Sequence, residues 1–185
     1  MRTLLLLSVV GLVACMFFHV AGWTSVDAQD QYPYFWAPAI GIFVVWIPLV
    51  RLQNKLSAAQ GTRPDSKVLR THAPAWMHTL SQGLMIYGVI WFFALIPLRG
   101  CDGNAARAPD GTYSVYGRRQ TIAGKPAGRI RIPISEARYH QMRNAEVQML
   151  TAWVAMFYGV AVTGYVSELI RRREERERGS TSVVR

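Results

Sequence analysis

Residues Val147–Ile170 read VQMLTAWVAMFYGVAVTGYVSELI, an apolar segment whose only charged residue is Glu168. A bilayer core of roughly 30 Å requires about 20 mostly apolar residues in a helix, so this segment predicts a membrane span. Three further blocks of similar length contain no Lys or Arg: Thr3–Trp23, Tyr32–Val50 and Ala75–Leu98. The chain of 185 residues is therefore predicted to be one integral domain, an all-α membrane protein with four transmembrane helices in a bundle.

The composition agrees with that class and limits the choice of partners. The chain is 51% hydrophobic and 17% charged, against a usual charged fraction of about 25%. Its net charge of +10 would indicate nucleic acid binding in a soluble protein. Here the basic residues fall in loops and the tail, where they indicate membrane orientation and lipid contacts. The predicted partners are the bilayer and either a second copy or another membrane protein, with no nucleic acid.

The distribution of basic residues predicts the orientation. The segment 51–74 carries five Lys and Arg residues against one acid, Asp65, and is therefore placed in the cytoplasm. Counting crossings puts both termini and the basic tail 171–185 inside, and the segment 100–146 outside. That outer segment is itself basic, which argues against this orientation. The reverse orientation, however, would place two other basic segments, 51–74 and 171–185, outside the cytoplasm. The prediction is a multi-pass protein of a bacterial inner membrane.

The outer segment contains a strand pattern. Ile130, Ile132 and Ile134 alternate with other residues, and a period of two with β-branched side chains is typical of a strand. A turn at residues 124–126 predicts a small β-hairpin that pairs 118–122 with 129–134. A single hairpin is only marginally stable in water, so it is expected to lie on the membrane or to pair with another protein.

The fourth span is predicted to belong to a longer helix. Ser135 is a favourable N-cap, and no proline occurs from Glu136 to about Arg178. A single helix of some 40 residues is therefore expected, and only the part at 147–170 can lie in the membrane.

Small residues spaced four apart predict the faces through which the helices pack, because such residues let membrane helices approach closely. One such row occurs in each block: Gly11 with Cys15, Ala37 with Gly41, Thr79 with Gly83, and Ala155 with Gly159 and Thr163.

Polar residues inside spans are candidates for function. They are His19, His78, Ser81, Gln82, Thr163 and Glu168. His19 and His78 are predicted to differ in depth by roughly 20 Å, which is too far for one metal ion or haem. His140 is expected outside and His72 inside. No metal site and no cofactor are therefore predicted.

Two groups of these residues have a specific interpretation. His78, Ser81 and Gln82 share one helix face, which indicates either a polar path or hydrogen bonding between helices. Glu168 is followed at i+3 and i+4 by Arg171 and Arg172, so it is expected to be a paired interfacial acid. The pair Glu174–Arg178 is expected in the tail helix.

No catalytic constellation is recognisable in the sequence. The outer segment offers Asp102, Asp110, Glu136 and His140, of which the last two lie one helical turn apart. No catalytic residue is assigned. The sequence favours a non-enzymatic interaction or assembly subunit. The alternatives are a pore-forming or membrane-perturbing effector, and an immunity-type inhibitor of an envelope-acting toxin.

The two cysteines leave separate questions. Leu12–Phe18 reads LVACMFF, which resembles a lipobox ending at Cys15. The apolar run continues beyond Cys15 to full span length, so an uncleaved helix is favoured. Cys101 is predicted just outside the third span, where it either forms a disulfide between chains or remains a free thiol.

Overall fold

The computed structural model describes residues 1–24, 33–61, 71–99, 105–118 and 129–182. It is mostly helical, with α1 at Arg2–Ala21, η1 at Pro33–Phe35, α3 at Trp36–Ala59, α4 at Ala75–Arg99 and α5 at Glu136–Ser182. Three strands form a small sheet: β1 at Ala105–Arg107, β2 at Tyr113–Arg118 and β3 at Arg129–Pro133. All four long helices are apolar enough to cross a membrane, as predicted.

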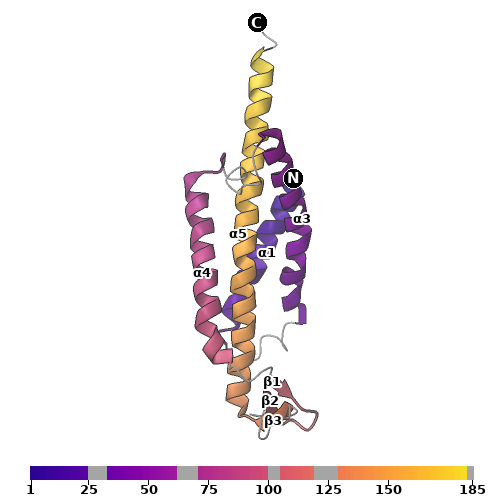
Figure 1. The fold of residues 1–185 in the computed structure, drawn as a ribbon, viewed down its shortest axis with the longest axis vertical. Helices are drawn as coiled ribbons and strands as arrows, with labels where there is room; N and C mark the ends of the chain where they lie inside the picture. Colours follow the sequence, from indigo (N-terminus) through magenta and orange to yellow (C-terminus); the bar gives the residue numbers. More distant parts are fainter. Residues whose placement is uncertain (25–32, 62–70, 100–104, 119–128, 183–185) are drawn as a thin grey trace.

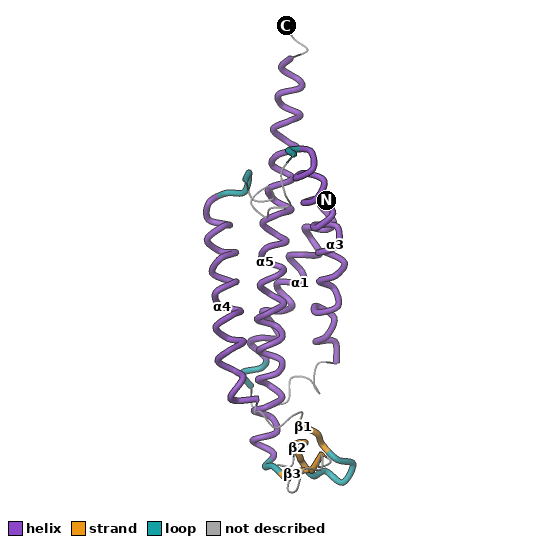
Figure 2. The backbone as a smooth tube through the Cα atoms, in the orientation of Figure 1, coloured by secondary structure: helices purple, strands orange, loops and turns teal. Residues whose placement is uncertain are grey.

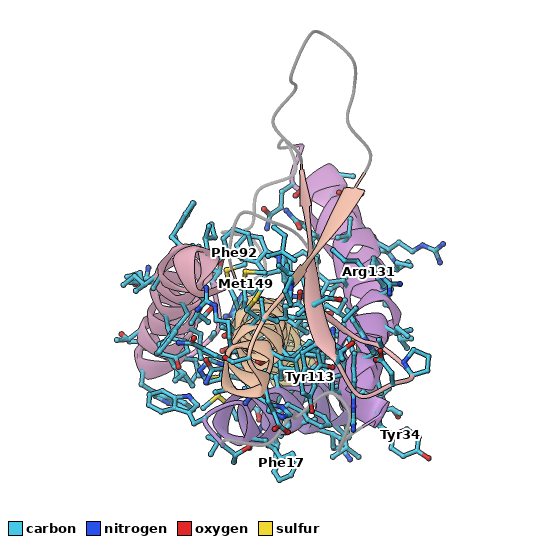
Figure 3. All side chains as sticks on the ribbon, turned by 90° about the horizontal axis from the view of Figure 1, so that it is seen from below. Phe17, Tyr34, Phe92, Tyr113, Arg131 and Met149 are labelled. Atoms are coloured by element: carbon cyan, nitrogen blue, oxygen red, sulfur yellow. The ribbon has the colours of Figure 1, made fainter. Side chains whose placement is uncertain are left out.

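Helix α5 is the centre of the molecule. Figure 1 shows α4 on one side of it and α1 with α3 on the other. In the most apolar window of α5, 56% of residues are buried, against 17% in α3 and in α4. The outer faces of the surrounding helices instead expose large apolar side chains, including Phe43, Ile90 and Phe93. In Figure 3, Phe17 and Tyr34 point away from α5, whereas Phe92 and Met149 lie between α4 and α5.

Helix α5 is continuous, as the absence of proline predicts. Its start is capped, because the backbone N–H of Arg138 donates to Ser135 Oγ at 3.2 Å. The helix then runs 47 residues to Ser182 and extends beyond the other helices at the end opposite the sheet (Figure 1).

Helix α3 is longer than the sequence predicts. The predicted span ends at Val50 and a loop was expected from Arg51, but the helix continues through Lys55 to Ala59. It also contains Pro48 in its interior. The last turns are polar and remain helical because Arg51, Gln53 and Lys55 need no burial there and are good helix formers.

Helices α3 and α5 run in the same direction, held in register by two tyrosines. Tyr158 donates its hydroxyl to the Pro38 carbonyl at 2.8 Å, and Tyr165 donates to the Val45 carbonyl at 2.7 Å. Both the donors and the acceptors are seven residues apart, about two helical turns. In return, Trp46 Nε1 donates to the Phe157 carbonyl at 3.2 Å.

Three of the four predicted small-residue rows contain residues that pack against other helices. An added Cβ at Gly11 would lie 2.2 Å from the Tyr158 ring, and one at Gly159 would lie 2.6 Å from Leu84. An added Cβ at Gly41 would lie 2.8 Å from the Tyr158 hydroxyl, although Ala37 is exposed. The row Thr79–Gly83 is not a contact face within the chain, because nothing described lies within 4 Å of that position. The reason is that α4 faces α5 through Ser81, Leu84 and Gly88 instead.

The strands form an antiparallel sheet in the order β1-β2-β3 beyond the helix ends (Figures 1 and 2). The predicted partner of β3 was 118–122, whereas β3 pairs with β2, so Val115 opposes Ile132. Residues 119–128 lie outside the described part of the chain. The β1–β2 turn has Gly111 at φ +84°, and Thr112 donates to Asp110 Oδ1 from both its backbone N–H and its hydroxyl. These bonds hold the pKa of Asp110 below its usual range.

Candidate functional site

A buried histidine joins α1, α4 and α5. His19 is 5% exposed and lies near the end of α1. Its Nε2 is 2.6 Å from the Tyr87 hydroxyl on α4, and its Nδ1 is 3.2 Å from the Gln148 carbonyl and 3.3 Å from Thr151 Oγ1 on α5. We call His19, Tyr87 and Thr151 the histidine node.

The donor and acceptor roles in the histidine node follow from its neighbours. The Gln148 carbonyl can only accept, so Nδ1 carries the proton and Nε2 accepts from the Tyr87 hydroxyl. Thr151 donates its own hydroxyl to the Val147 carbonyl at 2.7 Å, which leaves its oxygen free to accept from Nδ1. One neutral tautomer of His19 therefore satisfies every hydrogen bond in the node.

Aromatic rings enclose the node on the α4 side. The His19 ring contacts Tyr87 and Trp91 edge-on, with centroids 5.5 and 5.6 Å away. Trp23 packs against Trp91 at 5.7 Å. Tyr87 and Trp91 are one turn apart on α4, so one face of this helix supplies both contacts.

The hydrogen bonds of the histidine node are suited to holding helices in place and not to passing a proton. A hydrogen-bonded chain can pass a proton onward only if its last member can accept and release one. Here the chain runs from Tyr87 through His19 and Thr151 and ends on backbone carbonyls. The node therefore fixes the rotation and depth of α1, α4 and α5 relative to one another.

A cavity that opens to the surface lies next to the node, on the sheet side. It has a volume of about 320 Å³ and lies between the end of α1 and the first turns of α5. Gln148 lines this cavity with its side chain and bonds His19 with its carbonyl. His140 also lines it, and its Nδ1 is buried with no hydrogen-bond partner in the described chain.

The residues His78, Ser81 and Gln82 do not converge on a path. Ser81 is buried against the core, and its hydroxyl is one of the described polar groups without a hydrogen-bond partner. Gln82 is exposed on the outer face of α4, and His78 is half-buried. His19 contacts Tyr87, which is nine residues beyond His78 on α4. The two histidines therefore differ in depth by about 14 Å.

The predicted pairing of Glu168 with Arg171 and Arg172 is confirmed. Its carboxylate is 1% exposed and receives Nε and Nη2 of Arg171, both at 2.8 Å, and Nε of Arg172 at 2.7 Å. Three charge-assisted hydrogen bonds thus offset the cost of burying this carboxylate. Thr163 is buried and donates to the Gly159 carbonyl at 3.0 Å within α5.

The remaining histidines have local roles. His72 Nδ1 lies 3.2 Å from Glu174, and the His72 backbone N–H donates to Ser167 Oγ at 3.0 Å. The predicted pair Glu174–Arg178 is replaced by this contact, and the i,i+4 pairs in the tail are Arg171–Glu175 and Arg173–Glu177. At the other end of α5, His140 Nε2 lies 3.6 Å from Glu136.

The structure describes one of the two cysteines. Cys15 is fully buried in α1 against the core. Cys101 and Asp102 lie outside the described residues, so the expectations for them stay predictions. No group of three or more His, Cys, Asp or Glu side chains in the described residues is arranged to hold a metal ion.

The sequence named His19 as a candidate but missed its partners. Tyr87, Trp91 and Thr151 are ordinary residues for a membrane helix, and their meeting depends on how three helices are rotated. The only available signal was the spacing of Tyr87 and Trp91 on one face. A comparison with protein-family models, curated proteins and solved structures finds no match for this chain.

The histidine node predicts a measurable coupling between His19 and Tyr87. In a double-mutant cycle with His19→Leu and Tyr87→Phe, we expect a coupling energy of about 0.6–1.7 kcal/mol, the usual range for hydrogen bonds between membrane helices. Unfolding of the purified protein in mixed detergent measures it. Tyr34→Phe removes the same atom from a side chain that is 79% exposed and should leave stability unchanged. Additive losses in the cycle would mean that the contact stabilises nothing.

Proposed function

We propose that the protein is a non-enzymatic subunit of a bacterial inner membrane that binds a partner chain through its sheet. The positive-inside rule supports the orientation. The start of α1, the last turns of α3 and the last turns of α5 all lie at the end opposite the sheet (Figure 1). By sequence these segments carry Arg2, Arg51, Lys55 and the basic segment 171–178. Both termini are then cytoplasmic, the four helices form a transmembrane bundle and the sheet is periplasmic.

The observation that carries this proposal is an apolar row across the sheet. Ala105, Val115 and Ile132 are side by side on three neighbouring strands. Ala105 and Val115 are covered by α5 and are 7% and 5% exposed, whereas Ile132 is 43% exposed. In the described chain β3 has a neighbouring strand only on its β2 side. An added strand would cover Ile132 and pair with the β3 backbone.

The sheet packs against the first turns of α5. The Tyr113 ring packs against the ring of Tyr139, which is in the first turn of α5, with centroids 4.8 Å apart and ring planes tilted by 36°. Figure 3 shows Tyr113 beside α5. Tyr113 also donates its hydroxyl to Glu136 at 3.0 Å, and its carbonyl accepts the N–H of Ile134 at 3.0 Å. A partner strand on β3 is therefore coupled to the position of α5.

The test is crosslinking in membranes, followed by mass spectrometry of the adduct. Ile132→Glu should reduce the yield of a discrete adduct at least about tenfold, because it places a charge in the apolar row. Ile132→Val keeps a β-branched apolar side chain and should keep the adduct. Pro109→Glu puts the same charge in the β1–β2 turn and should also keep it.

Two results would overturn the proposal. An adduct that persists unchanged in Ile132→Glu would remove the sheet edge from the interface. Rapid ion flux through liposomes that contain only this protein would favour the pore-forming alternative. If the adduct forms and proves to be a toxin, rescue of cells by the wild type but not by Ile132→Glu would identify an immunity role for the same edge.

A further inference from the structure

A groove at the end opposite the sheet combines cationic and apolar walls. It lies between the start of α1 and α5 and has a volume of about 960 Å³. Its lining includes the residues Arg2, Leu169, Ile170, Arg172, Arg173 and Arg176. Leu169 and Ile170 are the last apolar residues of the span in α5, and Arg2 immediately precedes the apolar part of α1. The groove therefore lies where hydrocarbon gives way to water.

The lining has a surplus of positive charge. Its four arginines face one acid, Glu177, which gives +4 − 1 = +3. Arg173 pairs with Glu177 and Arg172 with Glu168. Arg2 and Arg176 have no acidic partner in the described chain. Their guanidinium groups therefore remain available to an anion.

The other face of the same helix is different. There a cavity of about 350 Å³ is lined by Arg171 and Arg178 together with Glu174 and Glu175, so these charges balance. The surplus thus lies on the α5 face beside α1 and continues onto the adjoining surface of Arg171, Arg172, Glu175 and Arg176, but it does not extend to the face with Glu174 and Arg178. A uniformly basic tail helix would carry a surplus of positive charge on both faces.

We propose that the groove between α1 and α5 binds the phosphate of an anionic phospholipid headgroup. Guanidinium groups hold phosphate through paired hydrogen bonds, and Arg172, Arg173 and Arg176 lie within four residues on α5. Leu169 and Ile170 supply the apolar wall for the glycerol end of the acyl chains. The site is independent of any partner on the sheet.

The test uses the full chain in detergent with phosphatidylglycerol or phosphatidylcholine added, and native mass spectrometry to count bound lipids. The wild type should retain phosphatidylglycerol in preference to phosphatidylcholine. The variant Arg2→Gln/Arg176→Gln should lose that preference by roughly 25-fold, about fivefold for each arginine. The control Arg178→Gln removes one arginine charge from the balanced face and should bind as the wild type does, whereas its single-charge counterpart Arg176→Gln should lose about fivefold.

Two further arms make the outcome decisive. Arg2→Lys/Arg176→Lys keeps the charge and should retain most of the preference, which separates binding from any loss of folding. Inorganic phosphate at millimolar concentration should not displace the lipid, because it makes no apolar contact. Equal retention of both lipids, an equal loss in Arg178→Gln, or full displacement by inorganic phosphate would each overturn the assignment.

Discussion

Replacement of Gly88 by leucine is expected to force α4 away from α5 and to lower the free energy of unfolding by about 3 kcal/mol. A Cβ at Gly88 would lie 3.0 Å from the Ala152 carbonyl oxygen and 3.4 Å from Met156 Cβ. The first of these is backbone, so it cannot rotate aside, and the rest of the leucine side chain would have no space. Thermal unfolding in detergent, followed by circular dichroism, measures the loss.

Gly83 provides the matched control for this prediction. It lies five residues earlier on α4, and a Cβ there would meet nothing within 4 Å in the described chain. Gly83→Leu should therefore cause no loss of stability and should gain up to about 1 kcal/mol from helix propensity. Equal losses at the two positions would show that backbone approach at Gly88 does not determine how α4 packs.

The second large effect is expected at Gly11, where even alanine should destabilise by about 1–3 kcal/mol. A Cβ there would lie 2.2–2.7 Å from three carbon atoms of the Tyr158 ring. The ring has little freedom to move, because its hydroxyl is bonded to the Pro38 carbonyl at 2.8 Å and lies beside Gly41. This strain should exceed the roughly 1 kcal/mol that alanine gains over glycine in helix propensity.

A second substitution distinguishes this clash from a general effect on α1. In Gly11→Ala/Tyr158→Leu, the smaller side chain leaves space for the new methyl group. The double variant should therefore lose less stability than the sum of the two single variants, by at least about 0.5 kcal/mol. Gly83→Ala, the same change at an open position, should raise stability by up to about 1 kcal/mol, because only the gain in helix propensity remains. Additive losses would contradict the packing of Tyr158 between α1 and α3.

The helices could be predicted from sequence because their signals are local. Length and hydropathy identify four candidate spans, and the absence of proline from Glu136 to about Arg178 predicts α5 to within about one turn of its end at Ser182. The pairing of Glu168 with Arg171 and Arg172 was likewise predictable, because i,i+3 and i,i+4 neighbours meet on any helix. The end of α3 could not be predicted in this way, because the polar helical turns after Val50 have the same low hydropathy as a loop.

The contacts between helices could not be predicted because they depend on relative rotation. The spacing of Thr79 and Gly83 is the same as that of Gly11 and Cys15, yet only the latter pair faces a neighbour within the chain. Tyr158 and Tyr165 bind backbone carbonyls of α3, and a carbonyl leaves no signature in a sequence. The partners of His19 come from two other helices, so no single segment predicts the node.

The pairing of the strands also could not be predicted from local sequence. Alternation of isoleucines identified β3, but the choice of its partner depends on the connection between the strands. The structure pairs β3 with Tyr113–Arg118 because Tyr113 and Val115 then pack on α5 with Met142 and Tyr139. Burial against a distant helix thus decided a register that turn chemistry alone had placed elsewhere.

The central position of α5 also has a consequence for biosynthesis. Helices α1, α3 and α4 precede α5 in the chain and are therefore translated first. Until α5 follows, Gly88 and His19 Nδ1 lack their neighbours on that helix, and the carbonyls of Pro38 and Val45 lack their tyrosines. Membrane helices insert singly and associate afterwards. Tertiary structure in this protein is therefore completed only after translation of its last span, and a ribosome that stalls before residue 136 leaves three helices without their common partner.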